Sequence, residues 1–263
     1  MIEIGIIAGS GLQELGCEEI VETITLETPF GEPSDLYRIC SISRAKAAFL
    51  PRHGIPHHIP PHKINYRANI WGFKKLGIRK VISINAVGGI KEGLKPGVIV
   101  IPDQVIDMTH GRENTFFDKD EVVHIDLTEP FCKGLRELLF CAAENIGIPL
   151  VRSGTYACTN GPRLETGAEI RYFSTIGADI VGMTVMPEAS LAREAEICYA
   201  SISVVTNYAA GISKSKLTTE EVIDTMRSSI QKIGLLLKEF ILLSQERGSV
   251  ECLCQEALKG ARM

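Results

Sequence analysis

The chain has 263 residues, of which 45% are hydrophobic and 23% charged, a balance typical of an ordinary soluble protein. Its formal net charge of −4 gives no basic surface of the kind that binds nucleic acid. No stretch reaches the roughly 18 apolar residues that a membrane span requires, and the opening MIEIGIIAGSG does not resemble a signal peptide. A cytoplasmic protein with neither nucleic acid nor membrane as a partner is therefore expected.

Strand-like apolar runs alternate with helical patterns along the chain. The strand-like runs cover 4–8, 36–42, 81–85, 98–105, 150–155, 179–183 and 199–206. Apolar residues at helical spacing cover 63–76, 130–145, 166–176 and 187–195, and a capping-box spacing from Thr218 to Glu221 opens a helix that runs to about 246. This alternation predicts an α/β fold with a central mixed β-sheet flanked by helices. No linker or repeat divides the sequence, so residues 1–263 are expected to form a single domain.

Eight cysteines are spread along the chain, and none forms a zinc-binding pattern with histidine. Six lie in strand-like or helical apolar runs, where a free buried cysteine is common. These six are Cys17, Cys40, Cys132, Cys141, Cys158 and Cys198. Cys252 and Cys254 form a C-x-C near the C-terminus, which is either two incidental thiols or a redox pair or stabilising disulfide. The sequence leaves these interpretations open.

Small and polar residues follow several of the strand-like runs. In an open α/β sheet, ligands gather at the carboxyl ends of the strands. The ends in question carry Gly9-Ser10-Gly11, Arg52-His53, Asn85-Ala86, Met183-Thr184 and Thr206-Asn207. In IIAGSGL, the backbone N–H groups of a glycine turn and the Ser10 hydroxyl suit an anion. A dinucleotide site is not expected there, because Glu14 replaces the third glycine of G-x-G-x-x-G.

The segment LPRHGIPHHIPPH holds four of the six histidines. It contains no Asp, Glu or Cys to complete a metal site, so no metal is expected. Arg52 in this loop is suited to hold phosphate through a bidentate guanidinium. His57, His58 and His62 are at least as well interpreted as ordinary polar loop residues as they are by any functional role.

Two other residues have both an ordinary and a functional interpretation. Glu165 follows a Gly-Pro turn at the start of a helix, where acidic residues commonly serve the helix dipole. Asn207 ends the run SVVTNYAAG. It is either a turn-former or a side chain that offers a donor and an acceptor to a ligand.

Taken in order, these motifs resemble the trimeric purine nucleoside phosphorylases, and within them the methylthioadenosine phosphorylase branch. The resemblance covers most of the chain and rests on IIAGSGL, RHG, NYRANIWGFKKLG, INAVGGI, DQVIDMTHGR, TFFD, EPFC, GPRLET, GADIVGM and MPEASLAREAEICYASISVVTNYAAG. It implies a phosphorylase/hydrolase-like fold and phosphorolysis, in which phosphate attacks the sugar carbon of a purine nucleoside and releases the base in purine salvage. It implies no metal and no organic cofactor, with inorganic phosphate as the co-substrate.

The resemblance also assigns site residues by position. Phosphate would be held by Ser10, Arg52, His53, Asn85, Ala86 (through its main chain) and Thr184. The nucleoside would be bound by Met183, against the ribose, and by Glu165, Asn207, Tyr208, Ala209 and Thr219. His124 would reach a neighbouring subunit's site near the 5′ substituent, which makes the protein a homotrimer or a dimer of trimers. Catalysis, with His53, Glu165 and Asn207, would come from positioning phosphate and stabilising charge on the departing purine.

Residues 207 and 165 indicate which purine is bound. Where Asn207 stands, the methylthioadenosine branch typically has Asp; an amide, unlike a carboxylate, also donates to a 6-keto oxygen. Glu165 can accept the N1 proton of a 6-oxopurine, and Ala209 stands where the adenine-specific enzymes usually keep a second Asp. The leading prediction is therefore phosphorolysis of inosine and guanosine to the base and ribose 1-phosphate.

Three alternatives remain open. The first is S-methyl-5′-thioinosine or methylthioadenosine phosphorolysis by the same type of site. The others are a hydrolase that uses water instead of phosphate and, in a different class, a non-catalytic nucleoside-binding protein.

Overall fold

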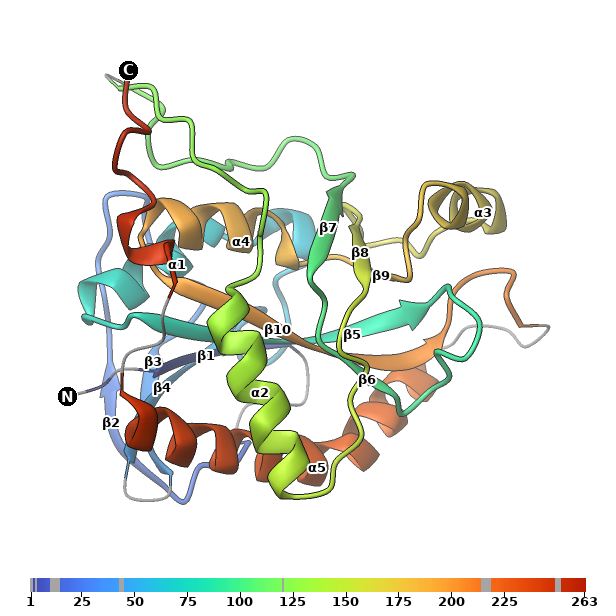
Figure 1. Ribbon diagram of the computed structural model, residues 1–263. Coiled ribbons are helices and arrows are strands. Elements are labelled where there is room, and N and C mark those ends of the chain that lie inside the picture. The colour runs from blue at the N-terminus through green and yellow to red at the C-terminus, as the bar shows by residue number, and fades with distance from the viewer. Residues whose placement is uncertain are drawn as a thin grey trace.

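The computed structural model describes residues 2, 4–9, 15–42, 45–119, 121–213, 219–248 and 252–263, with the side chains of residues 219 and 221 excepted. These residues form one α/β domain in which a ten-stranded mixed sheet separates layers of helices (Figure 1). The predicted fold class is confirmed. Among the described helices, none has the length and apolar character needed to cross a membrane.

The sheet has a parallel centre. Its strands are β1 (Ile4–Ala8), β2 (Glu19–Ile24), β3 (Tyr37–Ile42), β4 (Ala45–Pro51), β5 (Lys80–Gly89), β6 (Ile99–Val100), β7 (Gln104–Asp107), β8 (Thr155–Cys158), β9 (Ile180–Gly182) and β10 (Cys198–Tyr208). The hydrogen-bonded order is β2-β3-β4-β1-β5-β9-β8-β7, with β10 paired to β5 and β6. Because β4, β1, β5 and β10 are parallel neighbours, their carboxyl ends lie together at one edge.

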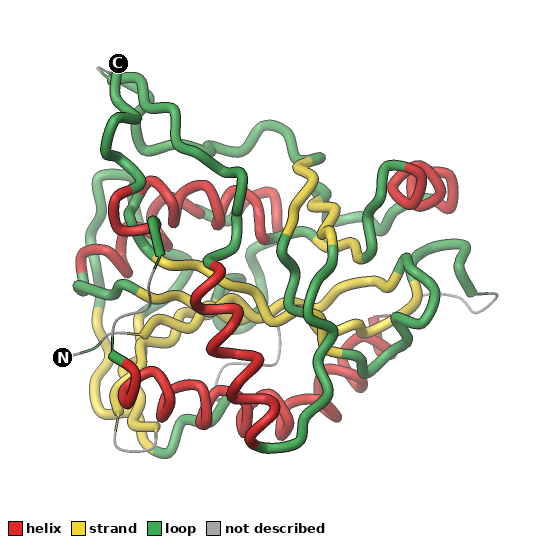
Figure 2. Tube along the Cα trace, in the orientation of Figure 1, coloured by secondary structure: helices red, strands yellow, loops and turns green. Residues whose placement is uncertain are grey.

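Helices cover both faces of the sheet. They are α1 (Tyr66–Lys75), α2 (Lys133–Asn145), α3 (Gly167–Thr175), α4 (Val185–Glu194) and α5 (Thr219–Arg247). α2 and α5 pack on one face and α1 and α4 on the other, while α3 packs beside β8 and β9 (Figures 1 and 2).

Side chains of β10 alternate between the two helix layers. Ala200, Ile202 and Val204 face α2 and α5, whereas Tyr199 and Val205 face α1 and α4. Side chains of β5 alternate between the two helix layers in the same way. Polar side chains at alternate positions of β5 and β10 therefore lie on the same face of the sheet and are buried together.

The predicted elements differ from the observed ones at four places. β4 lies outside the predicted strand ranges, although Arg52-His53 was expected to follow a strand-like run. The expected strand 98–105 is two short strands, β6 and β7, because Pro102 between them cannot donate to a strand ladder. The expected strand 150–155 is mostly loop, since β8 begins only at Thr155. β2 was not predicted, because this edge strand is almost entirely exposed and has no apolar face to reveal it.

One pair of cysteines also differs from the expectation of free buried thiols. A disulfide joins Cys17 and Cys40, whose Cα atoms are 5.3 Å apart. It links the segment before the edge strand β2 to the neighbouring strand β3.

Candidate active site

A pocket of about 970 Å³ lies where the parallel strands end. Gly9 follows β1, and Arg52 follows β4, while Asn85 and Asn207 lie in the last parts of β5 and β10. The first turns of α5 close another side, through residues that include Val222. Most of the residues expected from the sequence line this pocket: Arg52, His53, Asn85, Ala86, Glu165, Met183, Thr184, Asn207 and Ala209.

Four expected site residues are placed differently. Ser10 lies outside the described residues, and Thr219 begins α5, whose following turns line the pocket. Tyr208 is not among the lining residues; its carbonyl accepts a hydrogen bond from the Asn207 amide. His124 is exposed and lies outside this pocket, with its backbone N–H donating to the Ala261 carbonyl at 2.9 Å.

The wall of the pocket beneath Gly9 is built on a buried ion pair between Arg52 and Glu188. Their side chains are 1% and 0% exposed. Arg52 Nε and Nη2 bind the two carboxylate oxygens, and Nη2 also donates to Ser83 Oγ at 2.6 Å. Tyr199 donates its hydroxyl to the same carboxylate at 2.7 Å. Burial is the largest single influence and acts to lower the pKa of Arg52, but the charge and the hydrogen bond of Glu188, with smaller contributions from Tyr199 and Tyr66, together raise that pKa.

This pairing limits what Arg52 can offer to a ligand. Nη1 is the guanidinium nitrogen that Glu188 does not engage, and its contact with the Ile84 carbonyl is long, at 3.4 Å. A Cβ atom placed on Gly9 would lie 3.6 Å from Nη1, so this nitrogen lies beside Gly9. The bidentate fork predicted from the sequence is therefore not available in this arrangement, because Nε and Nη2 are committed to the protein.

A buried polar row runs beneath the pocket. Ser83 lies opposite Ser201 across β5 and β10, and Asn85 lies opposite Ser203. Asn85 Nδ2 donates to Ser83 at 3.0 Å and to Ser201 at 2.8 Å, while its Oδ1 accepts from Thr184 Oγ1 at 2.7 Å. Both amide hydrogens of Asn85 are thus used, so its side chain supports the site and has no N–H left for phosphate.

The sequence interpretation missed this supporting row. Ser83, Tyr199, Ser201 and Ser203 were not singled out, although VISINAV and YASISVV place polar side chains at alternate positions of strongly apolar strands. Polar residues at every second position of a strand point to the same face of the sheet. Where the strand is buried, these side chains need hydrogen-bond partners within the protein, so a buried polar row is predicted.

His53 is held as a neutral ring. Its Nδ1 lies 2.7 Å from the Ile59 carbonyl, which can only accept, so Nδ1 carries the proton. The ring stacks on His57 with the centroids 4.1 Å apart. Burial first, and then the charge of Arg52, lower the pKa of His53 to about 3. Nε2 is therefore an acceptor that can take a hydrogen bond from a protonated ligand oxygen.

Asn207 lies inside β10 rather than in a turn. The pairing of β10 with β5 shifts register between Val205 and Asn207, which marks a β-bulge of the kind that re-aims side chains at binding sites. Asn207 Oδ1 accepts from Thr206 Oγ1 at 2.9 Å, and Nδ2 donates to the Tyr208 carbonyl at 2.9 Å. One amide hydrogen and one oxygen lone pair remain for a ligand.

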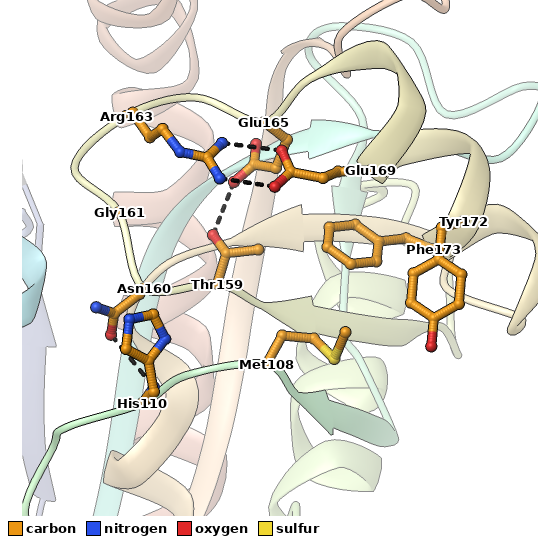
Figure 3. A pocket seen from close by; sticks show the side chains of 10 residues that line it. All are labelled: Met108, His110, Thr159, Asn160, Gly161, Arg163, Glu165, Glu169, Tyr172 and Phe173. Carbon is orange, nitrogen blue, oxygen red and sulfur yellow. Dashed lines mark hydrogen bonds and ion pairs between the residues drawn. The ribbon is translucent and has the colours of Figure 1, made fainter.

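Glu165 lines both the main pocket and a second pocket of about 640 Å³, and Figure 3 shows the second one. Its Oε1 accepts from Thr159 Oγ1 at 2.7 Å, and its Oε2 has no partner among the described residues. The neighbouring Thr166 caps α3 in a capping box with Glu169, which also pairs with Arg163. These contacts fix the loop that presents the Glu165 carboxylate.

The comparisons identify the family to which this site belongs. The chain belongs to the Phosphorylase superfamily, whose model matches residues 3–242. It is 56% identical over 262 residues to a probable S-methyl-5′-thioinosine phosphorylase from Thermodesulfovibrio yellowstonii, covering 99% of this chain and 97% of that protein. It is 47% identical over 269 residues to the 6-oxopurine nucleoside phosphorylase of Pyrococcus furiosus, covering 99% of each chain. A methylthioadenosine phosphorylase from Schistosoma mansoni, solved in complex with adenine, superposes with a TM-score of 0.93 at 34% identity, covering 100% of this chain and 99% of that one.

The buried ion pair gives a prediction about stability. Glu188→Gln leaves Arg52 as an unpaired buried cation and should lower the free energy of unfolding by about 3–5 kcal/mol. The double variant Arg52→Met with Glu188→Leu removes both charges and should recover at least half of that loss. Urea unfolding of the wild type and the two variants measures this. A double variant as unstable as Glu188→Gln would contradict the account.

The neutral state of His53 gives a prediction about pH. In the unfolded chain, histidine has a pKa near 6.5, so below that pH the unfolded state binds a proton that the folded state does not. Stability should therefore fall as the pH drops from 6.5 toward 3, by about 2 kcal/mol at pH 5 from this residue. Unfolding at pH 7 and pH 5 should show a smaller loss in His53→Gln than in the wild type, and the exposed-residue control His124→Gln should match the wild type. Equal losses in all three proteins would rule out a depressed His53 pKa.

Proposed function

We propose that the protein is a purine nucleoside phosphorylase, a pentosyltransferase that cleaves 6-oxopurine nucleosides such as inosine and guanosine to the base and ribose 1-phosphate. The observation that carries this proposal is the pair formed by Asn207 and Glu165. Both line one pocket, and each keeps hydrogen-bonding capacity that no described residue uses: Glu165 its Oε2 atom, and Asn207 one amide hydrogen and one oxygen lone pair. The names of the relatives support the same substrate class.

The two side chains match the edge of a 6-oxopurine. The remaining Nδ2 hydrogen of Asn207 donates to the 6-keto oxygen, and its Oδ1 accepts the proton on N7. Glu165 Oε2 accepts the N1 proton. Adenine would present a lone pair at N1 to the carboxylate, a repulsive arrangement. As the bond between the sugar and the purine breaks, negative charge spreads to the 6-keto oxygen, where the Asn207 donor stabilises it.

Phosphate would occupy the other end of the pocket. Arg52 Nη1 would supply one donor, and Gly9, the exposed Ala86 and Thr184 line the same space. Ser10, which lies outside the described residues, remains the hydroxyl donor that the resemblance implies. The neutral His53 accepts a hydrogen bond from a protonated phosphate oxygen. With Met183 against the ribose, phosphate is held beneath the sugar carbon it attacks, so no protein nucleophile is required.

A second candidate, S-methyl-5′-thioinosine phosphorylase, is favoured by one observation. The first turns of α5 give the pocket an apolar wall made of Val222, Ile223 and Met226. This wall follows Thr219, the residue expected near the 5′ substituent of the nucleoside. An apolar wall accommodates a methylthio group better than a hydroxyl. The relative that is 56% identical carries that name. Both candidates share the same recognition of a 6-oxopurine.

The proposed assembly is a homotrimer or a dimer of trimers. His124 supports it, because this side chain is exposed and lies outside the pocket of its own chain, as a residue that serves a neighbouring site must.

The test of the proposed function is an activity panel with and without inorganic phosphate. Inosine, guanosine, adenosine and the 5′-methylthio analogues of inosine and adenosine are compared by kcat/KM. Phosphate-dependent cleavage of the 6-oxopurine nucleosides is expected. A higher kcat/KM for inosine than for 5′-methylthioinosine supports the first candidate, and the reverse order supports the second. Equal cleavage without phosphate would identify a hydrolase. Binding without turnover would identify a non-catalytic protein.

Changing the amide tests the base site. Asn207→Asp places an acceptor against the 6-keto oxygen and should lower kcat/KM for inosine by roughly tenfold to a hundredfold, since such a contact is worth about 1–3 kcal/mol. Adding Glu165→Ser should shift the preference further toward adenosine. The kcat/KM values for both nucleosides are measured in the wild type, both single variants and the double variant. An unchanged inosine-to-adenosine ratio in Asn207→Asp would remove Asn207 from base recognition.

The charge-free double variant tests the phosphate site separately from folding. Arg52→Met with Glu188→Leu is expected to fold but to lack the Nη1 donor, so its apparent KM for phosphate should rise on the order of tenfold or more. Its KM for inosine should change much less. A wild-type phosphate KM in the folded double variant would remove Arg52 from the phosphate site.

A further inference from the structure

Four cysteines from three separate elements meet beneath α2 and α5. Cys132 immediately precedes α2, Cys198 opens β10, and Cys252 and Cys254 lie in the C-terminal segment after α5. Their sulfur atoms all lie within 4.8 Å of one another. Cys252 is half-buried and the other three are buried. None of the four is in a disulfide, and the proposed reaction uses none of them.

We infer that these four cysteines, the cysteine cluster, form a tetrathiolate site for a structural zinc ion. Zinc binds thiolates at about 2.3 Å in a tetrahedron, which places neighbouring sulfurs about 3.8 Å apart. In the cluster, the sulfurs of Cys198 and Cys252 are 3.2 Å apart and no pair exceeds 4.8 Å, so no pair has to close by more than about 1 Å to reach this value. The adjustment needed to bind the ion is therefore small.

The donor set indicates both the metal and its role. Four sulfur ligands suit zinc and exclude calcium and magnesium, which require oxygen. With four protein ligands, no coordination position is open to a substrate, so the site is structural rather than catalytic.

The surroundings hold the ligands in place and offset their charge. The backbone N–H of Cys132 donates to the Tyr199 carbonyl at 2.8 Å, and that of Cys198 donates to the Arg79 carbonyl at 2.9 Å. A zinc ion with four thiolates carries a net negative charge. The positive N-terminal end of α2 begins beside Cys132, and Arg193 interacts electrostatically with Cys254.

The same sulfurs could instead pair as two disulfides. The structure does join Cys17 to Cys40, yet it leaves these four cysteines unjoined. A metal ion requires all four sulfurs to gather around one point, within 4.8 Å of one another as they do here, whereas two separate disulfides do not. The geometry therefore favours the metal, and the disulfide state is the outcome that would refute it.

The cluster would anchor one end of the C-terminal segment, residues 252–263. The other end pairs with a surface loop: Arg262 bridges to Val123, and the Ala261 carbonyl accepts from the backbone of His124 (Figure 1). Loss of zinc should thus loosen residues 252–263 and 121–124 while leaving the pocket ends of β5 and β10 unchanged.

The experiment measures zinc in the full-length protein, purified anaerobically with a reductant. Elemental analysis should give about one zinc ion per chain. Cys252→Ser, at the least buried ligand, should bind zinc on the order of tenfold or more weakly in competition with a chelator. Cys141→Ser, a free cysteine outside the cluster, is the matched control and should bind as the wild type does. Cobalt substitution should give sulfur-to-cobalt charge-transfer absorption that Cys252→Ser weakens.

Two results would overturn the inference, whatever the outcome of the activity panel. One is wild-type protein with reduced thiols that binds no zinc when the metal is supplied. The other is mass spectrometry of protein alkylated during lysis that finds the four cysteines in disulfides. Should Cys252→Ser fail to fold, hydrogen exchange of wild-type protein before and after zinc removal remains decisive. Faster exchange in 252–263 and 121–124 supports the site, and unchanged exchange refutes it.

Discussion

The buried ion pair between Arg52 and Glu188 is the constraint on which the rest of the site depends. A charge pair shielded from water is stable only if each hydrogen-bonding atom is satisfied, and here Ser83 and Tyr199 complete that arrangement. The four residues come from the end of β4, from α4, β5 and β10, so the ion pair fixes the relative positions of the elements that form the pocket. A change at any one of them must disturb the others.

This arrangement has a consequence for how an anion is received. Glu188 neutralises Arg52, and His53 is held without charge, so these groups bring no net positive charge to the pocket. Under the proposed function, phosphate would therefore be held by directed donors such as Arg52 Nη1 rather than by a net charge of these two groups. Directed donors of this kind favour a ligand in one orientation, which is what in-line attack on the sugar carbon requires.

Much of this site was predictable from the sequence because the motifs stand at strand ends. Parallel strands bring their carboxyl ends to one edge, so residues as distant as Arg52, Asn85, Thr184 and Asn207 were expected to meet, and they line one pocket. The sequence could not show which atoms remain available. For example, Asn85 donates both amide hydrogens to Ser83 and Ser201. These contacts depend on the register between β5 and β10, which the sequence does not reveal.

The features that the sequence did not predict were missed for two different physical reasons. β2 is an exposed edge strand whose residues have no buried face, so the apolar period that signals a strand is absent. The cysteine cluster was invisible for a different reason: Cys132, Cys198 and the C-x-C pair are far apart in the chain, and only the packing of α2 and the C-terminal segment against β10 brings them together.

The central claim is that Asn207 and Glu165 select a 6-oxopurine. Isothermal titration of hypoxanthine and adenine into the wild-type protein, in the presence of phosphate, tests it without the chemical step. The account predicts that hypoxanthine binds at least about tenfold more tightly, a difference of about 1.4 kcal/mol. Adenine binding as tightly as hypoxanthine, or more tightly, would contradict it.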